Sequence, residues 1–361
     1  MRNAILAGPT LDKALGLVRL GRLQARPISM QQLLPGQCVT RKEELLSLAE
    51  SAPSDLAPLI NPQKGTAVHL YVSRAKEVYA SKRIVFHVLS SLLPAGAFLQ
   101  LCEGVLVPSW PLYYAQRCSA LDTLSQRLKL GMELCGSYSH LVAGDESTSC
   151  FYREANSTGK LVADYRNPRI VPACSVEDLS LFLSQAYYLR GGAPARFAAK
   201  LLLDGSASPS ETLLALMISL PYKEGGYGFK DVELNPAVPI PPETLHLTST
   251  DLYHPDCYLP AIQVDLESQS YENHLGRKAL VRDASRRNDI QTLGIEVKDV
   301  TWDTVSHLDK LDRLALQLIH KEKELGVKGA ASHEGKVKQP DNKARRKLRL
   351  GELLPPWPYE Q

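Results

Sequence analysis

Two acidic residues and a glutamine lie close together between residues 251 and 265. Asp251 begins an apolar segment, and a second segment reads Ile262-Gln263-Val264-Asp265. Both segments are predicted to be strands. Carboxylate and amide oxygens are ligands for hard cations, and a bound cation can polarise a phosphate and activate a water. The pattern predicts a Mg²⁺ (or Mn²⁺) site at Asp251, Gln263 and Asp265, suited to phosphodiester hydrolysis. The other interpretation is that Asp251 and Asp265 are solvated acids at strand ends.

A helix and a third strand follow these acidic segments. Residues 277–293 are predicted to be helical up to Gly294, because glycine is a favoured helix terminator. Residues 295–302 are predicted to form a strand with apolar positions two apart. Arg286 and Arg287 on the helix could hold a phosphate. His274 could act as a general base, because the pKa of a free imidazole, about 6.5, suits proton transfer near neutrality.

This order of strand, strand, helix and strand resembles the PD-(D/E)xK restriction-endonuclease-like superfamily, in particular the branch of very-short-patch-repair endonucleases. The resemblance implies that Asp251 is the first metal carboxylate and Asp265 the second. Gln263 stands where the family has Glu, and His274 lies a few residues later than the family His. Because Gln263 removes one negative charge from the metal site, two functions stay open. The chain is either a metal-dependent DNA endonuclease or a catalytically degenerate DNA-binding or antitoxin-like regulatory protein.

Glu211 has a structural and a functional interpretation. Ser208, Pro209 and Glu211 have the spacing of a helix start, with Ser208 as N-cap and Glu211 as its capping-box partner. The resemblance adds that the first helix of the superfamily often directs a Glu toward the metal. Both roles can hold for one side chain.

Residues 69–138 resemble a second family, the AbiEi-type abortive-infection antitoxins. The residues that carry this resemblance are Gly104-Val105-Leu106-Val107, Pro108-Ser109 and the helix end Glu133-Leu134-Cys135-Gly136-Ser137-Tyr138. The pairing with a restriction-like region implies a bacterial defence context and a toxin or other defence-system partner. His87, between Phe86 and Val88, is expected to be structural rather than catalytic.

The chain is expected to be of mixed α/β class, with a restriction-endonuclease-like domain after a smaller α+β region. The expected segments are a helical N-terminal arm (1–64), the antitoxin-like region (65–143), a polar boundary with a helical connector (144–204), the restriction-like domain (205–325) and a mobile basic tail (326–361). The tail either contacts DNA phosphates through basic side chains or is simply a solvated segment; the basic side chains are Lys343, Arg345, Arg346 and Lys347.

Composition restricts the remaining function classes. The chain has 361 residues, of which 44% are hydrophobic and 22% charged, as in globular proteins generally. Its net charge of +3 is too small to indicate a nucleic-acid partner by itself. No segment has the length of a membrane span, so no membrane partner is expected. The seven cysteines include no Cys-x-x-Cys pair, which indicates neither zinc nor disulfides and favours a cytoplasmic location.

Overall fold

The computed structural model describes residues 2–89, 91–139, 152–155, 161–164, 170–248, 251–269, 290 and 293–354. Helices and strands are mixed throughout, as expected. The chain divides into two compact units, each described separately below. Unit 1 comprises Met1–Leu134, Ser139–Tyr152 and Asn167–Lys200, and unit 2 comprises Cys135–Tyr138, Arg153–Arg166 and Leu201–Gln361. The predicted helix at 277–293, with Arg286 and Arg287, lies almost entirely outside the described residues, and so does His274.

Unit 1 contains a four-stranded sheet with the order β1-β6-β5-β2. Its strands are β1 (Ala4–Ile5), β2 (Arg26–Ile28), β5 (Phe98–Cys102) and β6 (Val105–Pro108). β5 and β6 form a hairpin, and Gly104 at its turn has a φ of 75°. Residues 1–64 differ from the expected separate arm, because β1 pairs with β6 and β2 pairs with β5. The buried side chains of Ala4 and Ile5 explain why this segment is part of the core.

The other elements of unit 1 are mostly helices. β3 (Val68–Val72) and β4 (Ile84–Val88) form a parallel pair, and η1 spans Ala75–Glu77. β7 (Tyr152–Ala155) and β8 (Leu161–Asp164), which belong to unit 2 except for Tyr152, pair with each other. The α-helices are α1 (Gly8–Arg19), α2 (Lys42–Ser51), α3 (Ala57–Ile60), α4 (Trp110–Cys118), α5 (Leu124–Leu134), α6 (Val176–Gln185) and α7 (Gly192–Ala199).

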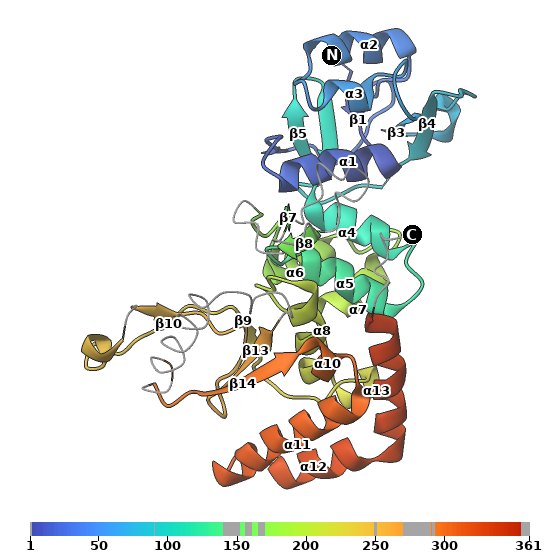
Figure 1. The fold of residues 1–361 in the computed structure, drawn as a ribbon. Coiled ribbons are helices and arrows are strands. Elements are labelled where there is room, and N and C mark those ends of the chain that lie inside the picture. The colour runs from blue at the N-terminus through green and yellow to red at the C-terminus, as the bar shows by residue number, and fades with distance from the viewer. Residues whose placement is uncertain are drawn as a thin grey trace. The chain divides into compact units, whose positions relative to one another are not determined.

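Unit 2 is built on a second four-stranded sheet with the order β14-β13-β12-β9 (Figure 1). Its strands are β9 (Glu233–Leu234), β12 (Cys257–Leu259), β13 (Val264–Gln269) and β14 (Glu296–Thr301). β9, β12 and β13 pair antiparallel, and β14 joins β13 in parallel. A separate ribbon pairs β10 (Val238–Pro239) with β11 (Leu252–Tyr253). Short 3₁₀ turns lie at Tyr222–Glu224 (η2) and Leu245–Leu247 (η3).

The helices of unit 2 are α8 (Pro209–Ser219), α10 (Trp302–Val305), α11 (Leu308–Glu324), α12 (Ala330–Lys338) and α13 (Pro340–Leu353). In α11 an apolar stripe is buried at Leu311, Leu314, Ala315 and Leu318. The C-terminal segment, expected to be a mobile tail, forms α12 and α13, which pack against each other and against α11 (Figure 1). None of the described helices could cross a membrane.

Candidate functional site

The structure does not bring the three predicted metal ligands together on neighbouring strands. Asp251 is exposed and precedes β11, which pairs with β10 outside the four-stranded sheet. Gln263 is exposed in the turn before β13, where it has a φ of 53° and donates its backbone N–H to the Pro260 carbonyl at 3.3 Å. Asp265 lies on β13 and is completely buried. Of the predicted trio, only Asp265 has the burial of a preorganised site.

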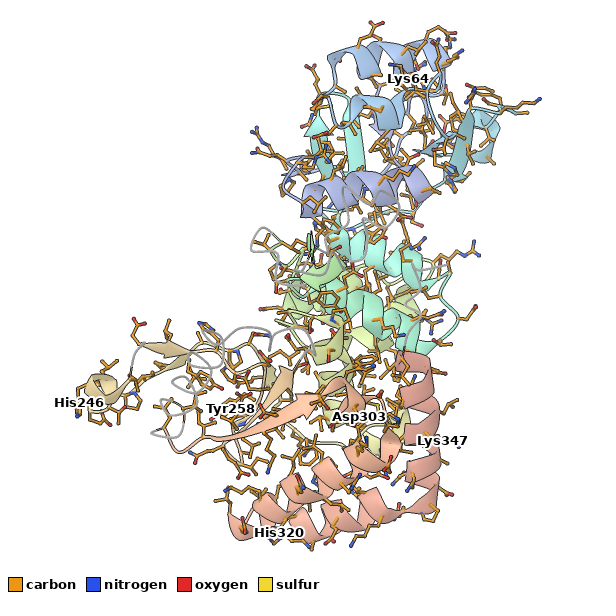
Figure 2. The ribbon with its side chains drawn as sticks, in the orientation of Figure 1. Lys64, His246, Tyr258, Asp303, His320 and Lys347 are labelled. Carbon is orange, nitrogen blue, oxygen red and sulfur yellow. The ribbon has the colours of Figure 1, made fainter. Side chains whose placement is uncertain are left out.

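Asp265 has an acidic neighbour that the sequence analysis missed. Glu267 is two residues further along β13 and is 8% exposed. Because alternate residues of a strand project from the same face, Asp265 and Glu267 share one side of the sheet. Tyr258 lies opposite Asp265 in the pairing of β12 with β13, and Figure 2 marks its position.

Tyr253 of β11 joins the two carboxylates. Its hydroxyl donates a hydrogen bond to Asp265 Oδ2 and lies 3.1 Å from Glu267 Oε1. The Tyr253 side chain is 3% exposed, so all three groups are withdrawn from water. The segment that was expected to supply Asp251 therefore contributes a tyrosine two residues later.

Asp265 and Glu267 cannot both carry a negative charge at these positions without an electrostatic cost. Burial, reinforced by the neighbouring Glu267 carboxylate, raises the pKa of Asp265 to about 9. Asp265 Oδ1 is buried and has no hydrogen-bond partner in the described part of the chain. A buried carboxylate oxygen without a partner costs free energy, and a second acid beside it increases the cost. Asp265 and Glu267 therefore fit a divalent cation, which would neutralise the pair and occupy the unpaired oxygen.

Asp256 is the third buried acid near this face. It is 5% exposed, and its Oδ2 accepts a hydrogen bond from the Ser268 N–H at 2.9 Å, across β12 and β13. Its charge contributes to the raised pKa of Asp265. Cys257, the next residue, is buried, and both burial and the surrounding carboxylates raise its thiol pKa. This thiol therefore stays protonated and is not a nucleophile.

Glu211 has the structural role expected of it. The Ser208 hydroxyl accepts a hydrogen bond from the Glu211 N–H at 3.2 Å and donates one to Glu211 Oε1 at 3.0 Å. Glu211 Oε2 accepts from the Ala207 N–H and from Asn235 Nδ2, both at 2.8 Å. Both carboxylate oxygens thus serve the N-terminus of α8 and the turn after β9.

The predicted DNA-gripping residues of α13 have different environments. Arg346 is fully buried and forms an ion pair with Asp312 at 3.0 Å. Lys343 lies 3.3 Å from the same carboxylate. Arg345 and Lys347 are exposed, and Figure 2 marks Lys347 on α13. Arg346 therefore holds the fold together, whereas Arg345 and Lys347 remain accessible to a ligand.

Two sequence signals could have located the buried acids. Asp265-Leu266-Glu267 places two acids at the alternation of one strand face, and Asp256 follows Pro255 directly before β12. Within the described residues, no group of three or more acidic, histidine or cysteine side chains has the geometry to hold a metal. The buried acids Asp265 and Glu267 form a pair rather than such a group.

No family model, curated protein or solved structure matches this chain.

Proposed function

We propose that unit 2 is a metal-dependent nuclease domain that hydrolyses phosphodiester bonds in DNA. The observation that carries this proposal is the buried pair Asp265 and Glu267, with Asp265 Oδ1 unpaired. A protein rarely keeps two adjacent buried carboxylates without a compensating group. Buried acids with a raised pKa, such as Asp265, cluster at functional sites.

The strand order supports the same proposal. Helix α8 precedes the antiparallel strands β9, β12 and β13, and β14 then adds in parallel to β13. This arrangement resembles the core of the PD-(D/E)xK superfamily. The matching acids are then Asp256, after Pro255, and the pair Asp265 and Glu267, with Glu267 in the position of the motif lysine. When the motif is aligned in this way, Gln263 lies outside the site, and its neutral side chain removes no charge from the proposed metal ligands.

Each residue of the site has a distinct role in this proposal. Asp265 and Glu267 would hold Mg²⁺ (or Mn²⁺), a hard cation that prefers carboxylate oxygens. The cation would supply polarisation of the phosphate and a more acidic bound water. Tyr253 orients both carboxylates through its hydroxyl. Asp256 is held by the Ser268 N–H. The roles predicted for His274, Arg286 and Arg287 fall on residues outside the described part of the chain and stay predictions.

One observation favours the second candidate, a degenerate DNA-binding or antitoxin-like regulatory protein. The Tyr253 hydroxyl already contacts both acids, so a hydrogen-bonded network could stabilise the sheet without a metal. In that protein Arg345 and Lys347 would contact DNA, or a toxin would be the partner, and no phosphodiester bond would be cleaved.

Plasmid nicking separates the two candidates. We expect the full chain to nick supercoiled plasmid in Mg²⁺ or Mn²⁺ but not in EDTA. Asp265→Asn and Glu267→Gln should abolish nicking, because each removes a negative charge that holds the cation. Asp251→Asn and Gln263→Glu are matched controls, since both side chains are exposed outside the pair. Nicking that survives Asp265→Asn but disappears in Asp251→Asn would place the site elsewhere. A folded wild type that binds DNA without cleaving it would favour the regulatory protein.

A further inference from the structure

Two tyrosines are unusually exposed in the turn between α6 and α7 of unit 1. Tyr187 is 69% exposed and Tyr188 is 93% exposed. Their ring centroids are 5.7 Å apart at an interplanar angle of 79°. Adjacent aromatic rings in water are unfavourable, and such exposed patches commonly mark binding surfaces.

The turn that carries these tyrosines is held firmly. Ala186 and Leu189, on either side of the pair, are buried. The Gly192 N–H donates to the Leu189 carbonyl at 2.8 Å. Gly191 has a φ of 82°, and a Cβ there would lie 2.3 Å from the Ala115 carbonyl oxygen, so the turn packs directly against α4. The tyrosines are therefore presented by a fixed backbone, which lowers the entropy cost of binding a ligand.

Positive side chains follow the tyrosines along the chain, and this stretch contains no acidic residue. Arg190 and Lys200 are exposed, and the Arg196 guanidinium lies 4.9 Å from the centroid of the Tyr187 ring. No Asp or Glu occurs between residues 179 and 203.

Helix α7 extends this surface. Phe197, which is 43% exposed, lies on α7, and Lys200 is the C-cap residue three positions later, so the two side chains lie on the same face. The surface thus combines aromatic rings with positive charge.

We propose that these residues (Tyr187, Tyr188, Arg190, Arg196, Phe197 and Lys200), here called the tyrosine–arginine surface, bind single-stranded nucleic acid. Exposed aromatic rings stack on unpaired bases, and Arg and Lys follow the phosphates. The bases of a duplex already stack on each other and leave no face for Tyr188. The uniformly positive charge fits a phosphate backbone. This surface belongs to unit 1, so the inference goes beyond the phosphodiester chemistry proposed for unit 2.

Fluorescence anisotropy of the full chain with a labelled 20-nucleotide oligo(dT), in EDTA, tests the proposal. We expect Tyr188→Ala to weaken binding roughly 5- to 150-fold, the range for loss of one stacked base. Tyr188→Phe should keep the affinity, because the ring remains. Arg190→Ala should lower the slope of log affinity against log salt by about 0.7, the value for one single-strand phosphate contact.

Tyr79→Ala is the matched control, since Tyr79 is also an exposed tyrosine of unit 1, at 43% exposure, but lies in another segment. An equal loss of affinity in Tyr79→Ala and Tyr188→Ala would overturn the proposal. Equal affinity for a 20-base-pair duplex would also overturn it. A Tyr188→Ala variant that binds DNA normally but loses self-association on a sizing column would show that the surface contacts protein instead.

The proposal for the acid pair and the proposal for the tyrosine–arginine surface can be refuted independently. Because the assay contains EDTA, no metal chemistry contributes to the affinity. Asp265→Asn should therefore bind the oligonucleotide as the wild type does.

Discussion

Arg346 offers the sharpest test of how unit 2 is held together. Its guanidinium is fully buried and stacks 4.7 Å from the centroid of the Tyr227 ring. Arg346 Nε donates to Asp312 Oδ1 at 3.1 Å, and Nη2 donates to the Val337 carbonyl at 2.8 Å. Tyr227 Oη donates to the same Asp312 oxygen at 2.8 Å. One carboxylate thus joins α11, α13 and the turn after α8.

The surroundings of Arg346 determine how much stability its replacement should cost. Removing one partner of a buried ion pair costs about 3 to 5 kcal/mol, because the other charge is left uncompensated. Lys343 lies 3.3 Å from Asp312 and partly compensates its charge, so we expect Arg346→Met to cost about 3 kcal/mol of unfolding free energy. For a unit of this size the melting temperature should then fall by roughly 6 to 12 °C.

Thermal unfolding by circular dichroism measures this change. Arg345→Met is the control on the adjacent, exposed position, and we expect a change within about 0.5 kcal/mol. The double variant Asp312→Leu/Arg346→Met should regain part of the loss, because it removes both charges together. If Arg346→Met melts within 2 °C of Arg345→Met, about the change that 0.5 kcal/mol produces, then the buried pair does not stabilise unit 2 and the reasoning is wrong.

Three further predictions concern stability. His69 Nδ1 and His87 Nε2 are 3.0 Å apart, and burial lowers the pKa of both rings. The native state therefore resists protonation, so unit 1 should be most stable above pH 6.5 and should lose stability as the pH falls through that value. Thermal melts at pH 5 and pH 7.5 measure this loss, and His87→Gln should make it smaller. Ser208→Ala should cost about 0.5 to 2 kcal/mol in urea unfolding, because the N-cap of α8 is lost. Gly226→Ala should destabilise unit 2 in the same assay, because its Cβ would lie 2.1 Å from the Leu220 carbonyl oxygen; an unchanged midpoint would contradict this packing.

Local signals in the sequence predicted some of the elements of unit 2. Ser208 caps α8 as expected. Strand β14 lies close to its predicted position, because it has a clear apolar period. These features depend on neighbours within a few residues, which the sequence shows directly.

The candidate site was only partly predictable, because long-range pairing decides it. Asp265 was identified, but the strand was expected to begin before Gln263. Gln263 instead ends a turn and has a positive φ. Because non-glycine residues seldom adopt a positive φ, nothing in the sequence indicates this conformation. β11 pairs with β10 over two residues, so no apolar pattern could reveal that Tyr253 would face the acids. The basic composition of α13 likewise does not show that Arg346 pairs with Asp312, because Asp312 lies far away in the sequence, on α11.

The docking of α13 also affects how unit 2 forms during protein synthesis. α13 contacts α8 and η2, and Arg349 Nε donates to the Glu224 carbonyl at 2.7 Å. A ribosome makes α8 on the order of ten seconds before α13, at ordinary rates of elongation. During that interval the surface that α13 later covers stays open to chaperones and proteases. The unit that carries the acid pair therefore becomes fully protected only after its last helix has left the ribosome.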